Sequence, residues 1–126
     1  GEPGVDEVSI SGKTKVSQLE DGEIDTYFIR PDDFGLQVAS PREIAGGTRE
    51  VSAKILRDVL GGREEGAKRD VVLLNAASAI FAAGESETLT DACEIAREIL
   101  ESGKAEAKLN EFLDFATQAQ GDDISG

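Results

Sequence analysis

The segment from Asp70 to Ala83 constrains the fold most, because nearly all of its residues are apolar or small. Its length and its alanines favour a helix over a strand, although Val71-Val72 alone would suit either structure. Gly84 follows directly, and glycine commonly ends a helix. The sequence therefore predicts a buried helix over residues 70–83, against which the other elements must pack.

Two short segments upstream of this helix carry the signal of a β-hairpin. Thr14 to Leu19 and Glu23 to Ile29 are joined through Glu20-Asp21-Gly22, and Asp-Gly is a strong hairpin turn. One face of the second strand is expected to carry Ile24, Thr26 and Phe28. Pro31 ends this strand because it has no N–H for the ladder. Residues 31–35 are expected to form a tight turn or a single helical turn.

Capping residues and glycines divide the remaining chain into helices. Ser40-Pro41-Arg42-Glu43 has the form of a capping box with proline at the first helical position, so it predicts a short helix that stops at Gly46-Gly47. Three amphipathic segments are also expected to be helical: Thr48 to Leu60, Thr88 to Leu100 and Lys104 to about Gln118. We expect one domain over residues 1–118 and a disordered tail over residues 119–126.

The composition excludes several kinds of chemistry. The chain has no histidine, which removes the commonest general base, the usual zinc ligand and any histidine-based triad. Cys93 is the only cysteine and lies among apolar helix positions, so we interpret it as a small buried residue and not as a nucleophile. Any chemistry must therefore use carboxylates, lysines, arginines or a bound hard metal ion.

The charge of the chain argues against a nucleic-acid partner. The formal charge is −13, from 26 acidic and 13 basic residues, and such a surface repels phosphate backbones. A well-solvated surface explains this acidity, and a salt-rich cytoplasm would also produce it. No apolar run approaches the ~20 residues that span a membrane. The first residues do not resemble a secretion leader, so we expect a cytoplasmic protein.

Asp6-Glu7, set between Gly4 and Ser9, is the most informative polar feature. Adjacent carboxylates are usually a solvated surface pair. The alternative is a magnesium site, because Mg²⁺ takes hard oxygen ligands and often binds one or two carboxylates together with substrate phosphates. Val8 and Ile10 lie at strand spacing, and neighbouring side chains of a strand point to opposite faces. Both carboxylates can therefore serve one site only where the backbone is irregular, which Gly4 allows.

Other polar or glycine-rich positions have a structural interpretation that we favour. Gly46-Gly47 and Gly61-Gly62 are interpreted as helix ends and not as phosphate loops, because neither matches a complete phosphate-binding fingerprint. Lys13 and Lys15 lie near the acidic pair in sequence and could face a phosphate, but are more often solvated strand residues. Asn75 lies in the predicted buried helix, so we expect its amide to hydrogen-bond to a neighbouring loop.

A series of short segments resembles the anthranilate phosphoribosyltransferases. Gly4-Val5-Asp6-Glu7-Val8-Ser9 is similar to the Gly-apolar-Asp-Glu-apolar-Ser segment of that family. Further segments follow in the family's order: Thr14, Asp21-Gly22, Pro31 to Leu36 as Pro-x-x-Phe-Gly-Leu, Gly46-Gly47, Val59-Leu60-Gly61, Val72-Leu73-Leu74-Asn75-Ala76-Ala77 and Ser102-Gly103-Lys104-Ala105. Each segment alone is weak evidence for the resemblance, but their joint order over nearly the whole chain is specific to that family.

The resemblance implies a fold and a function. The fold would be α/β, the C-terminal part of the α/β domain of the phosphoribosyltransferase/nucleoside phosphorylase-like fold, with a short β-hairpin and about four helices. The function would be transfer of phosphoribosyl from phosphoribosyl diphosphate to anthranilate in tryptophan biosynthesis, with Mg²⁺ held by Asp6 and Glu7. The resemblance assigns no further catalytic or cofactor-binding residue here. It implies a homodimer for the full-length enzyme and leaves the oligomeric state of this chain open.

The chain departs from the family pattern chiefly by what it lacks. The Gly-Thr-Gly-Gly-Asp diphosphate loop, the Lys-His-Gly-Asn segment and the arginine that helps bind anthranilate belong upstream of residue 1, so we expect this chain to be inactive alone. Ser52 also stands where the family often has asparagine. The alternatives are a non-catalytic binding module of the same superfamily and a pyrimidine-nucleoside phosphorylase fragment. Leu74-Asn75-Ala76-Ala77 favours the transferase, and the upstream coding sequence would discriminate the enzyme from the binding module.

Overall fold

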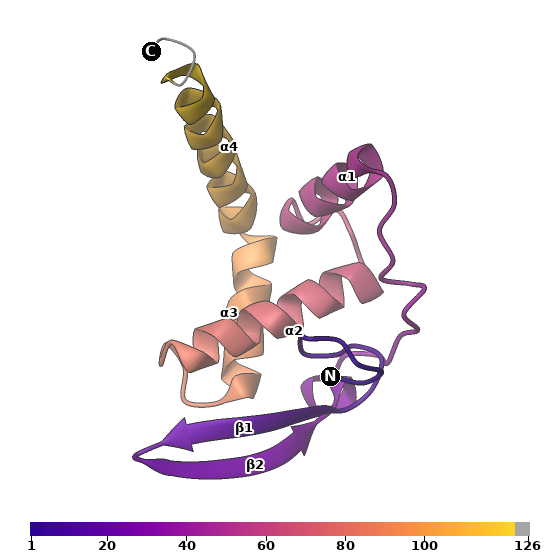
Figure 1. The fold of residues 1–126 in the computed structure, drawn as a ribbon, viewed down its shortest axis with the longest axis vertical. Helices are drawn as coiled ribbons and strands as arrows, with labels where there is room; N and C mark the ends of the chain where they lie inside the picture. The colour runs from indigo at the N-terminus through magenta and orange to yellow at the C-terminus, as the bar shows by residue number, and fades with distance from the viewer. Residues whose placement is uncertain (123–126) are drawn as a thin grey trace.

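Two antiparallel strands and four α-helices make up the part of the chain that the computed structural model describes, residues 1–122. The elements are β1 (Thr14–Glu20), β2 (Glu23–Ile29), the 3-10 turn η1 (Pro31–Phe34), α1 (Arg49–Leu60), α2 (Ala67–Ala82), α3 (Leu89–Glu101) and α4 (Lys104–Asp122). Helices α2 and α3 cross in the middle of the molecule, with the hairpin at one end and α1 and α4 at the other (Figure 1). The predicted hairpin with about four helices is confirmed.

The hairpin has the register that its turn sequence predicts. Thr14 pairs with Ile29 and Glu20 pairs with Glu23, which leaves Asp21 and Gly22 as a two-residue turn. Both turn residues have positive φ, 50° and 85°, as the twist of a tight hairpin requires. The face that carries Ile24, Thr26 and Phe28 is the outer one, with Ile24 72% and Phe28 58% exposed. The opposite face, which ends at the buried Ile29, lies towards α2.

The predicted central helix is confirmed, but its burial is one-sided. Helix α2 begins at Ala67, and Leu73, Leu74 and Ala77 are buried on the side that packs along α3. Ala76, Ala79 and Ala83 are exposed on another side. The expectation that residues 70–83 are buried throughout is therefore wrong, because no element of residues 1–122 covers that side of the helix.

The core lies where α2, α3 and the N-terminal loop meet. Its buried residues come from these three regions and from the turn after η1: Ile10, Leu36, Leu73, Leu74, Ala77, Ala92, Cys93, Ala96 and Leu100. Cys93 is 1% exposed, and burial raises the pKa of its thiol. A buried thiol with a raised pKa is a poor nucleophile, so the interpretation of Cys93 as a packing residue is confirmed.

The short helix predicted after Ser40 does not form. Residues 41–44 make a turn, although the N–H of Ser40 still donates to Oε2 of Glu43 at 2.8 Å. Starting a helix fixes several residues for one hydrogen bond, and Gly46-Gly47 follows before further turns can offset that cost. The capping contact is present without the helix. By contrast, Pro31–Phe34 forms the single helical turn expected there, closed by Gly35 at a φ of 71°.

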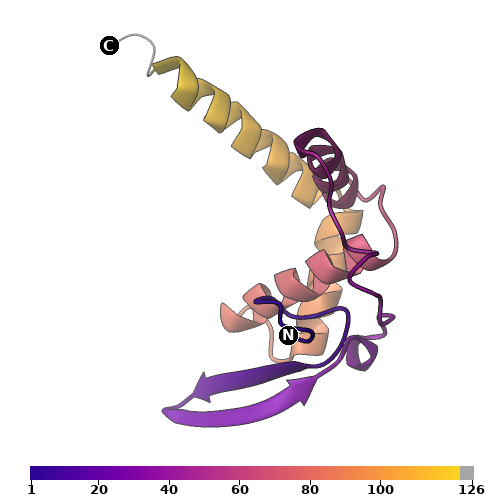
Figure 2. The ribbon, with the colours of Figure 1, turned by 45° about the vertical axis from the view of Figure 1, so that its right-hand side comes forward.

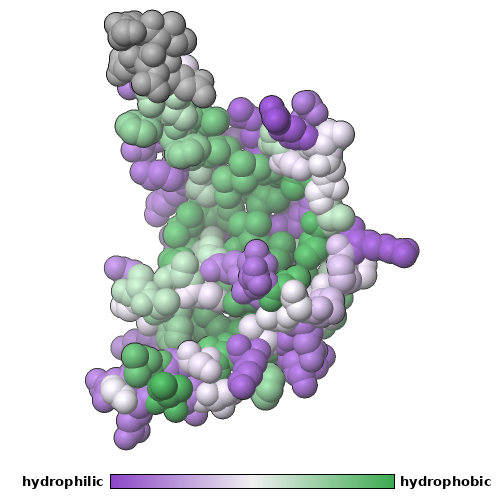
Figure 3. Space-filling view, viewed as in Figure 1, coloured by the Kyte–Doolittle hydropathy of each residue, from purple (hydrophilic) through white to green (hydrophobic). Residues whose placement is uncertain are grey.

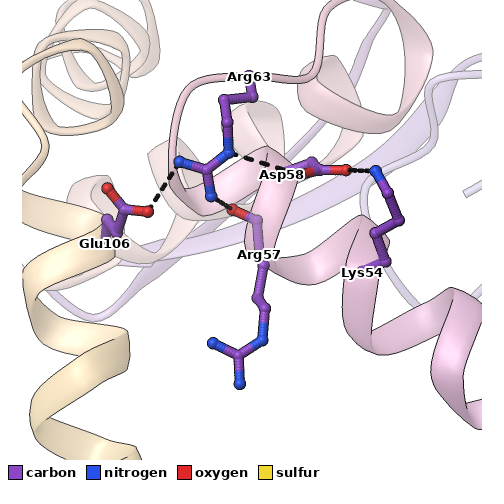
Figure 4. A network of polar contacts seen from close by, with 5 residues as sticks. All are labelled: Lys54, Arg57, Asp58, Arg63 and Glu106. Carbon is purple, nitrogen blue, oxygen red and sulfur yellow. Dashed lines mark hydrogen bonds and ion pairs between the residues drawn. The ribbon is translucent and has the colours of Figure 1, made fainter.

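Helices α1 and α4 are joined by one arginine. The guanidinium of Arg63 donates to Oε1 of Glu106 at 2.8 Å and to the carbonyl oxygen of Arg57 at 2.8 Å (Figure 4). Asp58 accepts from the same guanidinium at 3.5 Å and also from Lys54. Gly61 caps α1 through its N–H, and Gly62 has a φ of 66°, so Gly61-Gly62 ends the helix as predicted.

Helix α4 extends away from the other elements (Figure 2). It continues beyond its expected end at Gln118 to Asp122, and residues 123–126 of the expected tail lie outside the described residues. None of the helices in residues 1–122 has both the length and the apolar composition needed to cross a membrane.

Candidate functional site

The acidic pair lies on an irregular loop and not on a strand. Residues 5–10 belong to no strand, and the chain bends at Asp6 and Glu7. Gly4 precedes the pair with a φ of 109°, a conformation that favours glycine. The condition set by the sequence, an irregular backbone at two adjacent carboxylates, is therefore met. Both residues are exposed to solvent.

The chain becomes buried directly after the pair. Ser9 is 3% exposed and Ile10 is fully buried in the core. The N–H of Ser9 donates to Oγ1 of Thr14 at 2.9 Å, and the carbonyl oxygen of Ile10 accepts from the N–H of Ala39 at 3.0 Å. The backbone of this segment is thus satisfied by a side chain and by a single contact to Ala39 instead of a strand ladder, which explains why the strand spacing of Val8 and Ile10 does not produce a strand.

Asn75 provides the remaining anchor of this loop. Its Oδ1 accepts from the N–H of Val8 at 2.9 Å, and its Nδ2 donates to the carbonyl oxygen of Val8 at 2.9 Å. The expectation that Asn75 hydrogen-bonds to a neighbouring loop is confirmed. Sequence reasoning did not find the companion pair Ser9 and Thr14, both buried and polar. The signal available for them was the cluster Ser9-Ile10-Ser11, since serine side chains often bond to nearby backbone: the N–H of Ser11 donates to Oγ of Ser9 at 3.0 Å.

An open, mostly apolar pocket of about 390 Å³ lies beside the pair. Val5, Ile44 and Val71 contribute apolar surface, and Glu7 is the one charged residue among the described residues that line it. Asp6 is not part of this lining. The pocket therefore presents an apolar wall with a single carboxylate at its edge, next to a second carboxylate on the surface.

The two carboxylates of the loop can supply only some of the ligands of a metal ion. Within the described part of the chain, no group of three or more acidic, cysteine or histidine side chains comes together as a metal site. Two exposed carboxylates supply too few oxygens for a dedicated cage. They fit Mg²⁺, which often keeps water and takes its other ligands from substrate phosphates.

The two lysines considered as phosphate ligands do not contact the pair. Lys13 lies 3.8 Å from Oε1 of Glu2, with its ammonium 5.0 Å from the ring centre of Phe28. Lys15 is exposed on β1. The interpretation of both as strand-region surface residues is therefore the one that fits their positions.

Gly46-Gly47 lies between the turn at residues 41–44 and helix α1. The N–H of Gly47 donates to Oγ of Ser52 at 3.3 Å. A Cβ on Gly47 would lie 2.9 Å from Cγ1 of Val51, which explains the need for glycine there. Because no helix precedes it, this pair is not the helix end that the sequence predicted, but a close approach of the backbone to α1.

A separate charged cluster lies at the start of α2. Asp70 is largely buried, and Arg69 contacts it at 3.9 Å while also reaching Glu101 on α3 at 3.3 Å. Burial raises the pKa of the Asp70 carboxyl, and the charges of Arg69 and Arg97 partly oppose this. The cluster joins α2 to α3 and has no contact with the acidic loop among the described residues.

Comparisons with known proteins agree with the fold. Residues 1–106 match the family described as "Glycosyl transferase family, a/b domain". This chain therefore belongs to that glycosyl transferase family. Within it, the chain is 43% identical over 115 residues to the anthranilate phosphoribosyltransferase of Desulfosudis oleivorans, which covers 91% of this chain and 34% of the relative. The resemblance drawn from the ordered motifs is confirmed.

Solved structures show the same likeness. The anthranilate phosphoribosyltransferase of Thermus thermophilus superposes with a TM-score of 0.81 at 35% identity, over 91% of this chain and 33% of that one. The enzyme from Saccharomyces cerevisiae in complex with PRPP and Mg gives a TM-score of 0.79 at 27% identity, over 94% of this chain and 34% of that one. The chain thus spans about a third of the length of the relatives that it matches.

Proposed function

We propose that this chain contributes a magnesium-binding carboxylate pair, Asp6 and Glu7, to an anthranilate phosphoribosyltransferase. The complete enzyme transfers phosphoribosyl from PRPP (phosphoribosyl diphosphate) to the amine of anthranilate, a step in tryptophan biosynthesis. The observation that carries the proposal is the 43% identity to such an enzyme over 91% of this chain. The exposed, irregular loop that presents both carboxylates supports it.

The chemistry of the transfer explains why two carboxylates are useful. The bond between the anomeric carbon and the diphosphate oxygen breaks, the amine nitrogen bonds to that carbon, and the amine loses a proton. A bound Mg²⁺ supplies stabilisation of the negative charge that collects on the leaving diphosphate. Asp6 and Glu7 would hold the ion, and the buried residues after them hold the loop against the helices. The reaction needs no side-chain nucleophile.

The direct test is steady-state kinetics of the full-length protein with Mg²⁺ titrated. Asp6→Asn keeps the fold because the residue is exposed. We expect it to lower turnover at limiting Mg²⁺ by roughly 10²-fold, as loss of one preorganised electrostatic contact does, and added Mg²⁺ to restore part of the rate. Asp25→Asn, an exposed residue of β2, removes the same charge elsewhere and should leave the rate unchanged. Wild-type rates for both Asp6→Asn and Glu7→Gln would contradict a role in metal binding and would show that the two residues are solvated surface acids.

The chain alone is expected to be inactive. Mg²⁺ prefers about six oxygens in near-octahedral array, and the pair supplies only two side chains. The diphosphate loop and the Lys-His-Gly-Asn segment, which position the substrate in the resembling family, are not in this sequence. Without substrate positioning the advantage of proximity is lost. The homodimer and the cytoplasmic location stay predictions, the first testable by light scattering of the full-length protein.

A further inference from the structure

Asn75 joins helix α2 to the loop that carries the acidic pair, across 67 residues of sequence. Its amide forms two hydrogen bonds to the same residue, accepting from the N–H of Val8 and donating to the carbonyl oxygen of Val8, both at 2.9 Å. Nδ2 also donates to the carbonyl oxygen of Val71, one turn earlier on α2, at 2.9 Å. The two carbonyl partners identify the nitrogen side of the amide and fix its orientation.

These two hydrogen bonds between the Asn75 amide and Val8, called the Asn75 clamp below, satisfy both the N–H and the carbonyl oxygen of Val8. No simpler side chain supplies both partners. One amide supplies both the acceptor and the donor that a partner strand would otherwise supply to Val8. The contact is partly buried, so removal of the amide leaves two backbone groups with reduced access to water. The loop would then have to move to satisfy them.

The position of the clamp determines what such a movement would disturb. Val8 directly follows Glu7, and it is the first residue after the pair with an anchor on a helix. On the other side of the pair stand the exposed Val5 and Gly4. On that side Val5 bonds to Gly1 within the N-terminal turn, through its N–H at 3.1 Å and its carbonyl oxygen at 2.9 Å. The tie between the pair and the helical core therefore lies on the Val8 side, to a helix whose own position is fixed by Leu73 and Leu74.

The binding of Mg²⁺ depends on where the two carboxylates lie. The ion requires near-ideal octahedral geometry at 2.0–2.1 Å, so its ligands tolerate little displacement. Groups that hydrogen-bond to metal-ligating residues typically change metal affinity or activity by 10–100-fold when they are removed. We propose that Asn75 is a positioning residue that holds Asp6 and Glu7 in the geometry for binding Mg²⁺. This inference rests on the proposed function of the pair.

The test uses the full-length protein and its dependence on Mg²⁺. We expect Asn75→Ala to weaken Mg²⁺ binding by roughly tenfold, measured by titration calorimetry with PRPP present and anthranilate absent. The Mg²⁺ concentration for half-maximal rate should rise by a similar factor, and saturating Mg²⁺ should restore most of the rate. Ser78→Ala is the matched control, because Oγ of Ser78 is also partly buried on α2 but bonds to the carbonyl oxygen of Leu74 on its own helix. It should leave the Mg²⁺ dependence unchanged. If Asn75→Ala does not fold, Asn75→Asp keeps the size of the side chain and an acceptor for Val8, loses the donor, and should show the same shift.

A double-mutant cycle separates positioning from a general loss of stability. If Asn75 acts through the pair, the rate losses of Asn75→Ala and Asp6→Asn at limiting Mg²⁺ will not multiply: Asn75→Ala will slow the Asp6→Asn variant by a smaller factor than it slows the parent, because only Glu7 is left to position. Multiplicative losses, or an unchanged Mg²⁺ dependence in a folded Asn75 variant, would overturn the positioning role and leave the proposed function intact. Wild-type rates for both Asp6→Asn and Glu7→Gln would overturn both proposals together.

Discussion

Helices α2 and α3 bury their apolar faces against each other, whereas α1 and α4 leave much of theirs open. Leu73 and Leu74 on α2 are at most 1% exposed, while Phe112 and Phe115 on α4 are 63% and 69% exposed. Figure 3 shows apolar surface gathered between α4 and α1 on the face drawn. Helices α1, α3 and α4 have amphipathic sequences, so the same kind of pattern leads to two different outcomes.

This difference shows what an amphipathic pattern predicts about a helix and what it does not predict. A helical stripe of apolar residues indicates that one face favours burial. It does not indicate which element buries that face. In this chain α2 and α3 bury each other, and the described residues provide α1 and α4 with few contacts beyond the polar link through Arg63. Stability is therefore expected to be concentrated in the α2–α3 half.

The largest expected effect tests this concentration directly. Leu74→Ala should lower the free energy of unfolding by about 2–5 kcal/mol, because it leaves a cavity in the core. Phe112→Ala on α4 removes a larger side chain but should cost about 0.5 kcal/mol or less, because that side chain is mostly exposed. Equilibrium denaturation of the parent and both variants measures the two values. Similar losses would show that the two halves do not differ.

Two helix caps give a smaller and more local comparison. Oγ1 of Thr88 accepts from the N–H of Asp91 at 3.1 Å and donates to its carboxylate at 2.6 Å, at the start of α3. Thr88→Ala should lower the free energy of unfolding by about 1 kcal/mol. Thr48 caps α1 through a longer contact to Val51, 3.4 Å. Thr48→Ala should cost less and should mainly increase hydrogen exchange within α1, because a weakly packed helix opens locally. An equal loss of global stability would mean that α1 unfolds together with the core.

The smallest expected effect concerns Asp70, whose buried charge lowers the stability of the α2–α3 half. Burial raises the pKa of this carboxyl above its ordinary value of 3.8, so the folded chain holds the proton more tightly than the unfolded chain does. Above both pKa values the buried charge lowers stability, and the penalty disappears as the pH falls below 3.8. Asp70→Asn should therefore raise the denaturation midpoint slightly at pH 7, with the gain shrinking towards low pH. The exposed Asp25→Asn serves as the charge-matched control, and a loss of stability at pH 7 in Asp70→Asn would contradict the sign.

The elements that were predictable from sequence depend on local chemistry. Asp21-Gly22 specifies the hairpin turn because both positions need positive φ. Gly61 and Gly84 mark the ends of α1 and α2 as predicted, although α2 begins at Ala67, three residues before its expected start. Asn75 was predictable as a loop anchor, since a polar group in an apolar helix needs a partner.

Several local patterns do not produce the element or the role that they suggest. The strand spacing of Val8 and Ile10 gives no strand, because Asn75 and Thr14 satisfy the loop backbone instead. The capping box at Ser40 gives no helix, because Gly46-Gly47 leaves too short a segment. The role expected for Asp6 and Glu7 came from resemblance to a family, since two adjacent acids do not specify a metal site on their own.

The junction between α3 and α4 has a mechanical consequence. Ser102 and Gly103 alone separate the two helices, and Gly103 holds a φ of 78°. Helix α4 has 19 residues and is therefore roughly 28 Å long at 1.5 Å per residue. It acts as a lever about this pivot: a rotation of about 10° at Gly103 would carry its far end through about 5 Å, on the same rise per residue. The contact between Arg63 and Glu106 lies close to the pivot, where its leverage against such a rotation is small.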